Sequence, residues 1–443
     1  MEKSFGGSAM ILLFEEYNQL AKDLLYSLRQ THDDVIPVCM HYDGTLPDDI
    51  FSPFKNLVFT SDEGEPLYFN KLPMRHYDRI QSTMSEGKIY AGSRLRGRIF
   101  YHQPTHKRYI KDVDYLDENG KVCVTDHYDL KGRKYAQTSF FHKIGRVMRA
   151  YYNEKGQEVI TENFITKDII YNDLENNQIK LFKNIVEFTI FFLEKMGMAS
   201  QPIYFTSLSH PFFVSQRMPN RQREDVLFWQ EDIYDEIPGN MQVILSGEST
   251  STKKIFVQKP EAYRKLIELG ASQDMVKELG MIYDFKKNDK KKDIVILTNS
   301  DQIEKLNELV EACQDRKIHI AAITEMSGKL LKYGSYKNVR LYPNITESHA
   351  KKLIENCQYY FDINYGGEIL NAIREAFIHE MVIFAFEDTI HHHEYVAKEH
   401  IFNKGDMSSL MTVLLGDYHT QLNIQKKAAL SEDVNTYKEK LSQ

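Results

Sequence analysis

The chain has 443 residues, of which 42% are hydrophobic and 27% are charged, and its formal net charge at pH 7 is −7. This length exceeds what one hydrophobic core usually organises, so we expect two or three folded domains. The apolar content excludes an intrinsically disordered chain, and the acidic balance gives no reason to expect nucleic acid as a partner.

Cysteine use and hydropathy favour a cytoplasmic protein. The four cysteines, Cys39, Cys123, Cys313 and Cys357, lie far apart in the sequence and form no CxxC pair. We therefore expect reduced thiols packed among apolar side chains. No apolar run of the sequence approaches the roughly 20 residues of a membrane-spanning helix.

The first 65 residues contain a predicted helix and a predicted strand. Apolar residues recur every three to four positions over Met10–Arg29, a spacing that favours a helix. Ile36–His41 is a short apolar run typical of a strand, and Pro47 and Pro53 punctuate the loop that follows. These elements begin a predicted α/β domain that is made of residues 1–65 and 165–285.

An internal repeat of turn glycines lies between the two parts of this domain. Gly120, Gly132, Gly145 and Gly156 are separated by 12, 13 and 11 residues, and most follow polar turn-forming residues. Glycine supplies the positive φ of tight hairpin turns, and a period near twelve leaves about eight residues for each strand. The repeat predicts an antiparallel β-meander inserted over residues 66–164.

Aromatic and basic side chains are abundant on the predicted meander. A sheet that exposes such side chains suits an extended polypeptide or another protein subunit. The candidate residues for binding an acceptor or a partner are Arg94, Arg96, Tyr115, Tyr128, Tyr135 and Tyr151. The alternative, which we expect for most side chains of this kind, is packing against the neighbouring domain.

The pattern over residues 165–285 returns to alternating helices and strands. The expected elements are a helix at Ile179–Met196, strands at Pro202–Thr206, Val226–Gln230, Met241–Leu245 and Lys253–Val257, and a helix at Ala262–Leu269. Four acidic residues within Glu231–Glu236 raise the question of a metal. Their loop setting fits a solvated turn better, and we expect no metal there.

A charge run, Lys286–Lys292, is the predicted linker to a second α/β domain over residues 286–418. The expected strands and helices of this domain are, in order, Ile294–Thr298, Gln302–Gln314 (helix), Ile318–Ile323, Val339–Tyr342, Glu347–Asn356 (helix), Tyr359–Ile363 and Val382–Phe386. Helices at Leu410–Leu415 and Leu422–Leu441 close the chain. The alternation predicts a doubly wound domain of the nucleotide-binding type.

A glycine turn, Asn364–Gly367, precedes an apolar pattern that predicts a helix from Glu368 onward. A turn of this kind aims unpaired N–H groups and the positive end of the helix dipole at a ligand crevice. The stretch resembles the donor site of retaining GT-B glycosyltransferases. In that family, two glutamates separated by seven residues hold the sugar and ribose hydroxyls of the donor.

This resemblance is incomplete in the residues that matter chemically. Glu375 matches the second glutamate, but Gly367 stands where the first belongs, and Glu368 comes one residue late. One residue on a helix is a rotation of about 100°, so we expect the two carboxylates not to serve one ligand. The family also uses an Arg and a Lys near the first strand of this domain. Leu297–Asp301 contains no Arg, and Lys305 is the candidate for the Lys.

We therefore predict a degenerate donor pocket that does not turn over, with no catalytic residue, metal or cofactor. Its candidate residues are Asn299, Lys305, Gly366, Gly367, Glu368, Asn371 and Glu375. The three histidines within His391–Glu394 lack the spacing of a zinc protease. We interpret them as a solvated helix start.

A GT-B body that carries a β-meander resembles the subunits of one protein-modifying enzyme, the O-GlcNAc transferase linked to the accessory Sec export system. The likeness is carried by the repeat and by Phe228–Glu231, Ile237–Met241 and Asp362–Ala372. Among these subunits the chain is similar to the non-catalytic, stabilising GtfB type. The resemblance implies an α/β, GT-B-like fold: two Rossmann-like domains that face a cleft, the inserted meander, and a last helix (residues 419–443) that crosses back to the first domain.

The resemblance also implies partners. The catalytic subunit would supply the UDP-GlcNAc chemistry in a heterotetramer with two copies of each chain. The acceptor would be a serine-rich repeat adhesin, and the complex would work in the cytoplasm, with peripheral attachment to the inner face of the membrane as an open question. Two alternatives remain at this point: an active retaining GT-B enzyme that transfers GlcNAc to Ser or Thr, and a lectin-like carbohydrate-binding platform.

Overall fold

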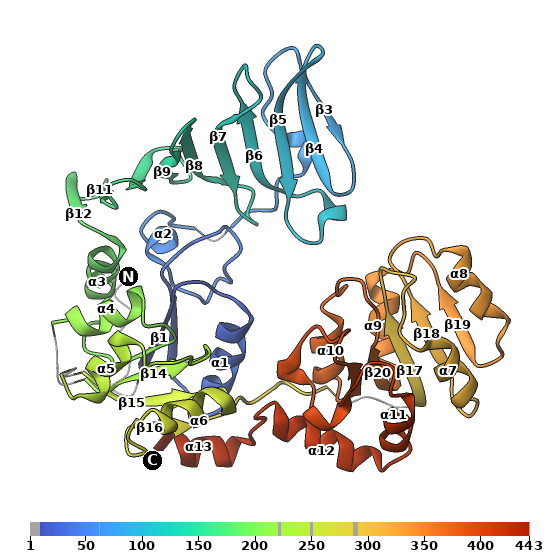
Figure 1. The fold of residues 1–443 in the computed structure, drawn as a ribbon. Helices are drawn as coiled ribbons and strands as arrows, with labels where there is room; N and C mark the ends of the chain where they lie inside the picture. The colour runs from blue at the N-terminus through green and yellow to red at the C-terminus, as the bar shows by residue number, and fades with distance from the viewer. Residues whose placement is uncertain (1–8, 62, 220–222, 249–250, 287–290, 443) are drawn as a thin grey trace. The chain divides into compact units, whose positions relative to one another are not determined.

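The computed structural model describes residues 9–61, 63–219, 223–248, 251–286 and 291–442 (Figure 1). The chain forms two compact units, of which the first ends at Glu278 and the second begins at Leu279. Among the described residues, no helix is long and apolar enough to cross a membrane. The longest of these helices have 11 residues, about half of what a bilayer requires.

The first unit contains a parallel six-stranded sheet in the order β16-β15-β14-β13-β1-β2. Its strands are β1 Met10–Phe14, β2 Val35–Cys39, β13 Ile203–Phe205, β14 Asp225–Trp229, β15 Thr252–Val257 and β16 Val276–Glu278. The helices of this unit are α1 Gln19–Arg29, α2 Pro53–Asn56, α3 Ile185–Lys195, α4 His210–Arg217, α5 Gly239–Leu245 and α6 Pro260–Glu268.

Three predicted elements of the first unit are wrong. The predicted helix Met10–Arg29 is strand β1 followed by helix α1, which begins where the Asn18 side chain accepts a hydrogen bond from the Ala21 amide. All five residues of β1 are buried, and such a run carries no alternation that distinguishes a strand from a helix. Met241–Leu245 is helical, and the first residues of the predicted helix Ile179–Met196 form a strand.

The predicted meander is confirmed as a ten-stranded antiparallel sheet whose strands follow one another in chain order (Figure 1). The strands are β3 Asp78–Ser82, β4 Glu86–Ala91, β5 Arg94–Tyr101, β6 Ile110–Leu116, β7 Val122–Tyr128, β8 Lys134–Phe141, β9 Gly145–Tyr152, β10 Glu158–Asn163, β11 Ile169–Asp173 and β12 Gln178–Phe182. The four repeat glycines have φ between +73° and +87°, as hairpin turns of this kind require. The sheet continues to Phe182, so the predicted end at residue 164 was wrong: it left out strands β11 and β12.

The later strands of the meander share a hydrophobic core with the parallel sheet. Tyr151 on β9 stacks on Phe54 of α2 with ring centroids 4.6 Å apart, and Phe54 contacts Phe188 of α3 at 5.4 Å. The earlier strands hold a separate small cluster that includes Ile89, Ile99 and Val113. One half of the meander is therefore anchored to the α/β domain by aromatic packing, which is worth more than its buried area alone.

The second unit contains another parallel six-stranded sheet, in the order β19-β18-β17-β20-β21-β22. Its strands are β17 Lys291–Leu297, β18 Ile318–Ala321, β19 Val339–Tyr342, β20 Cys357–Asp362, β21 Val382–Phe386 and β22 Ile401–Phe402. Its helices are α7 Leu306–Ala312, α8 Gly328–Leu331, α9 Glu347–Asn356, α10 Ala372–Ile378, α11 Met407–Leu414, α12 Tyr418–Ala428 and α13 Val434–Ser442.

The boundary between the units precedes the predicted linker. Residues 287–290 of the charge run lie outside the described residues. The segment before them belongs to the second unit, where the ring centroids of Tyr283 and Phe377 lie 4.9 Å apart. The predicted helix Leu422–Leu441 is two helices, α12 and α13, separated near Leu430, which has a φ of +48°. The predicted crossing of residues 419–443 to the first domain stays a prediction.

The two α/β sheets and the inserted meander confirm the predicted fold class. Each sheet of the Rossmann type places the carboxyl ends of its parallel strands at one edge, where open α/β sheets bind their ligands. These two edges are the natural places to look for a functional site.

Candidate functional sites

The first candidate site is the glycine turn after β20. Backbone hydrogen bonds tie it to the loop after β17: the Tyr365 amide donates to the Gln302 carbonyl at 2.9 Å, and the Glu304 amide donates to the Ile363 carbonyl at 2.8 Å. The turn therefore lies at the carboxyl ends of two adjacent strands of the second sheet, as predicted from the pattern.

Asn299 and the two glycines of the turn come together. A Cβ placed on Gly366 would overlap the Asn299 side chain, and one on Gly367 would lie 3.7 Å from Asn299 Nδ2. Gly366 is required by this close approach and not by its φ. The space above the turn, which a glycine-rich phosphate loop leaves open, is here taken by an amide side chain.

Glu368 does not lie on the helix. Helix α10 begins at Ala372, and Glu368 Oε1 accepts a hydrogen bond of 2.9 Å from the Ile373 amide. Its other oxygen accepts one of 2.9 Å from His392 Nε2. The expected 100° rotation between Glu368 and Glu375 on one helix is thus wrong, because Glu368 caps the helix from outside.

The remaining predicted pocket residues make their own local contacts. The Glu375 carboxylate lies 3.8 Å from His379 Nδ1, one turn along α10. Lys305 precedes α7 with a φ of +52°, and its Nζ lies 2.6 Å from Glu308 Oε1. Asn371 has a φ of +51° at the start of α10, a conformation that asparagine tolerates better than most residues. Lys305 therefore pairs with an acid of its own helix and not with the glycine turn.

A histidine pair that was not among the predicted site residues fills this site. His391 Nδ1 lies 2.7 Å from Asp362 Oδ1, and its Nε2 lies 2.6 Å from the Gly366 carbonyl oxygen. His392 bridges Glu368 at 2.9 Å and Glu394 at 3.0 Å. Carboxylates and carbonyls only accept hydrogen bonds, so both rings make these contacts fully when they carry two protons. The interpretation of His391–Glu394 as a solvated helix start is wrong for the first two histidines.

The electrostatics of the pair follow from burial and proximity. Burial raises the pKa of Asp362, and the hydrogen bonds from His391 offset part of that rise. Partial burial acts to lower the pKa of His392, but the nearby Glu394 and Glu368 carboxylates act more strongly in the opposite direction. The pKa of His392 is therefore higher than its usual value. The carboxylates of Asp362 and Glu368 at this edge of the sheet are consequently in hydrogen-bond contact with the protein's own imidazoles.

The second candidate site is a cavity of about 580 Å³ within the first unit. Its walls are the loops at the carboxyl ends of β1 and β2 and one face of strands β6 to β10. The residues that line it combine three chemistries: acidic side chains of Glu16, Asp43, Asp112 and Glu162, basic side chains of Lys111, His127, Arg146 and Arg149, and aromatic rings of Tyr17, Tyr42, Tyr135, Tyr151 and Phe164.

Hydrogen bonds and ring contacts fix the basic wall of this cavity. His127 bridges Asp112 at 2.6 Å and Thr138 at 2.7 Å. The guanidinium carbons of Arg146 and Arg149 lie 4.9 Å and 5.6 Å from the centroid of the Phe164 ring. A ligand with hydroxyl and amide groups would find donors, acceptors and flat apolar rings here.

The predicted meander residues divide between the core and the surface. Tyr128, Tyr135 and Tyr151 are buried and do not lie on an open surface of the sheet, whereas Tyr135 and Tyr151 line the cavity. Their role in binding an acceptor or a partner stays a prediction. Arg96 is held by Asp78 at 2.9 Å, and burial raises the pKa of the half-buried Tyr115 to about 12. Arg94 is exposed. Other cavity residues, such as His41 and Tyr42, were not predicted from the sequence. They belong to the loop after β2, and their position just after a parallel strand is the sequence feature that could have identified them.

Four family models match the chain. They are the GtfB N-terminal domain over residues 11–56, the GtfB middle domain over 78–183, the GtfB third domain over 185–269 and the GftB/GlyA-F C-terminal domain over 294–431. A "UDP-N-acetylglucosamine--peptide N-acetylglucosaminyltransferase stabilizing protein GtfB" from Streptococcus agalactiae is 42% identical, and the match covers 97% of this chain and 98% of the relative. The chain belongs to the GtfB family.

Solved structures agree with membership of the GtfB family. A chain of the "GtfA/B complex bound to UDP and GlcNAc" superposes with a TM-score of 0.90 at 36% identity and covers 98% of this chain and 99% of that one. TarM from S. aureus, in complex with Fondaparinux, alpha-GlcNAc-glycerol and UDP, has a TM-score of 0.55 at 12% identity, with 98% and 99% of the two chains covered. The second likeness concerns the fold alone, which is that of GT-B glycosyltransferases with an inserted β domain.

The full-length relatives in the GtfB family are named as stabilising proteins of a peptide N-acetylglucosaminyltransferase, not as the transferase itself. The prediction of a stabilising, non-catalytic subunit agrees with these names. The histidine-filled site after β20 gives that assignment a physical basis in the second unit.

Proposed function

We propose that this chain stabilises a catalytic glycosyltransferase subunit and holds the Ser- and Thr-rich polypeptide to which that subunit transfers GlcNAc. The observation that carries the proposal is the 42% identity to a stabilising protein over nearly the whole length of both chains. The catalytic partner, the polypeptide acceptor and a complex with two copies of each chain are parts of this proposal.

The site after β20 supports a subunit without donor chemistry of its own. Transfer from a nucleotide sugar needs cations or a helix N-terminus to stabilise the departing diphosphate, and acceptors to hold the sugar. Here Glu368 caps α10 and is paired with His392, while the His391 ring is hydrogen-bonded to Asp362. Every one of these groups already has a partner within the chain.

Calorimetry of the isolated chain with UDP-GlcNAc tests this part. We expect no binding heat, and no sugar transfer to an acceptor peptide when the chain is incubated alone. Transfer by the isolated chain that disappears in Glu375→Gln would instead establish the active retaining enzyme.

The cavity of the first unit supports acceptor binding. An extended Ser- and Thr-rich segment presents hydroxyls and backbone amides, and the cavity offers carboxylates, arginines and aromatic rings to receive them. Arg146 is exposed at the rim, so that its loss leaves the core intact. Arg94 is also exposed, but it lies at the β4–β5 hairpin and does not line the cavity.

Two matched substitutions separate these surfaces. Arg146→Ala should weaken binding of an unglycosylated serine-rich repeat peptide about tenfold, the effect of one lost charge-assisted contact. Arg94→Ala should leave the affinity unchanged. Equal affinities of Arg146→Ala and the unmodified chain would remove the cavity from the proposal, and weakened binding by Arg94→Ala would move the acceptor to the open face of the meander.

An apolar patch at the end of the meander supports a protein partner. Ile170 on β11 is the register partner of Leu181 on β12, and Ile179 lies two residues before Leu181, so all three share one face. Ile179 and Leu181 are 75% and 67% exposed. A strand at the edge of a sheet with exposed apolar side chains is a ready interface for another chain.

Co-purification with the catalytic subunit tests the patch. Leu181→Asp should abolish the complex while the chain stays folded, because the side chain is 67% exposed. Leu415→Asp, directly after α11, changes an equally exposed leucine of the second unit and should leave the complex intact. A stable complex with Leu181→Asp would place the interface elsewhere. The mass of the unmodified complex shows whether it contains two copies of each chain. Flotation of the complex with lipid vesicles shows whether it attaches peripherally to a membrane surface.

A further inference from the structure

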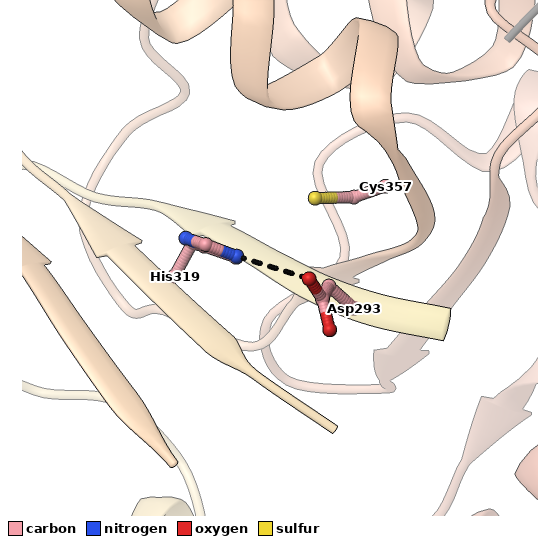
Figure 2. Close-up of side chains that lie close together, drawn as sticks. All are labelled: Asp293, His319 and Cys357. Carbon is pink, nitrogen blue, oxygen red and sulfur yellow. Dashed lines mark hydrogen bonds and ion pairs between the residues drawn. The ribbon is translucent and has the colours of Figure 1, made fainter. Parts of the chain in front are cut away.

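Three side chains of the zinc-ligand type gather on neighbouring strands of the second sheet. They are Asp293 on β17, His319 on β18 and Cys357 on β20, and their ligand atoms all lie within 4.8 Å of one another (Figure 2). Strand β17 lies between the other two in the sheet, so the cluster joins three adjacent strands. The donor set of one carboxylate, one imidazole and one thiol is the kind that zinc takes in proteins.

A β-bulge brings the sulfur to the same face as the other two groups. His319 is the register partner of Val295, which places it on the face of Asp293 and Val295. Between β17 and β20 the register shifts in the interval from Lys291 to Ile294. Because of this irregularity, Cys357 joins Val295 in one buried cluster. Bulges commonly re-aim a side chain at a site.

The distance between the imidazole and the carboxylate suits a shared metal ion better than a hydrogen bond. His319 Nε2 lies 3.5 Å from Asp293 Oδ2, beyond the usual 2.7–3.2 Å of an N–H···O bond. Two ligands on one tetrahedral zinc are about 3.3–3.6 Å apart, given the usual Zn–N, Zn–O and Zn–S bond lengths. The sulfur lies within 4.8 Å of the other two ligand atoms and has to approach them to about 3.3–3.6 Å to complete the set.

Further contacts orient two of these ligands. The Tyr342 hydroxyl lies 2.9 Å from His319 Nδ1, which leaves Nε2 for the cluster. The Lys317 amide donates to Asp293 Oδ1 at 2.9 Å, which leaves Oδ2. Zinc sites are typically supported by such outer hydrogen bonds, which fix the ring and the carboxylate.

We propose that Asp293, His319 and Cys357 bind a zinc ion, with water as the fourth ligand. The thiol disfavours magnesium and calcium, which prefer sets of oxygen ligands. The cluster lies near the amino ends of β17, β18 and β20, opposite the edge that carries the glycine turn. A zinc ion at this place would join three strands and would lie away from the edge that carries the predicted donor pocket.

Cobalt substitution of the full-length chain tests the site. The chain is freed of metal with a chelator, kept reduced and titrated with Co²⁺. We expect one equivalent to produce the visible bands of a tetrahedral ion and a thiolate-to-cobalt charge-transfer band in the near ultraviolet. Zinc should displace the cobalt and raise the melting temperature.

A matched pair of cysteine variants decides the assignment. Cys357→Ala should lose the charge-transfer band, whereas Cys313→Ala should keep it, because Cys313 is an equally buried thiol in the core on the other face of the sheet. His319→Gln should weaken cobalt binding at least tenfold, and it serves as the test if Cys357→Ala does not fold. Absence of the band from the unmodified chain, its persistence in Cys357→Ala, or an unchanged cobalt affinity of His319→Gln would overturn the proposal.

Discussion

The His391 imidazole joins the Asp362 carboxylate to the Gly366 carbonyl, with Nδ1–Oδ1 and Nε2–O distances of 2.7 and 2.6 Å. Asp362 is only 1% exposed, at the end of β20. A buried carboxylate is costly unless it is hydrogen-bonded and paired. The ring therefore does two things at once: it satisfies the acid and ties the glycine turn to the loop after β21.

Replacement of this ring should destabilise the second unit. In His391→Ala, Asp362 keeps the His391 backbone amide as a donor but loses the imidazole. We expect a loss of about 1.5–3 kcal/mol in the free energy of unfolding, the range for a hydrogen bond to a charged group. Urea denaturation measures it. His393→Ala, which removes an exposed neighbour, is the control and should change the midpoint little. Equal midpoints for the two variants would show that the ring is not part of the fold's support.

His392 should make stability depend on pH. Its pKa is raised in the folded chain by Glu394 and Glu368 despite partial burial. A group whose pKa is higher in the folded state stabilises fully below its unfolded value, about 6.5, and this stabilisation disappears as the pH rises through the folded value. The difference in urea midpoint between the unmodified chain and His392→Gln should thus be larger at pH 6 than at pH 8.5. A difference that grows with pH would contradict the ion pairs with Glu368 and Glu394.

The features that the sequence predicted well are those set by local chemistry. The glycine repeat specifies hairpin turns through positive φ, and Gly120, Gly132, Gly145 and Gly156 all have it. The alternation of strands and helices in the second unit follows from apolar periodicity. The prediction for Met10–Phe14 was wrong because a strand that is buried on both faces shows no alternation of apolar and polar residues.

The candidate sites depend on contacts that no local pattern encodes. His391 meets Asp362 across 29 residues of sequence, and the cavity of the first unit gathers loops and strands from Glu16 to Phe164. Tyr135 and Tyr151 were assigned to an open surface because a sheet has two faces and the sequence does not say which one another domain covers. Glu368 was placed on a helix that begins at Ala372, since capping residues and first-turn residues look alike in sequence.

The buried ion pair of the first unit should respond strongly to the loss of its cation. Arg223 and Asp225 are both 0% exposed in their side chains and lie 3.0 Å apart, and Asp225 also accepts from the Ile203 amide at 2.8 Å. Arg223→Met leaves the carboxylate without its counter-ion, so we expect a loss of about 3–5 kcal/mol. Arg264→Met removes an exposed pair with Glu261 and should cost about 0–1 kcal/mol. Similar losses in the two variants, measured by chemical denaturation, would contradict this ranking.

Gly366 should tolerate a methyl group only when Asn299 gives way. A Cβ at this position overlaps the Asn299 side chain, and overpacking of this kind costs about 1–3 kcal/mol. Gly366→Ala should therefore lower the free energy of unfolding by that amount, and the double variant Gly366→Ala, Asn299→Ala should recover most of it. Gly239→Ala is the control, since a Cβ there meets nothing within 4 Å. Additive effects of the two changes in the double variant would mean that Asn299 and the glycine turn do not touch, because residues in contact couple and separated ones add.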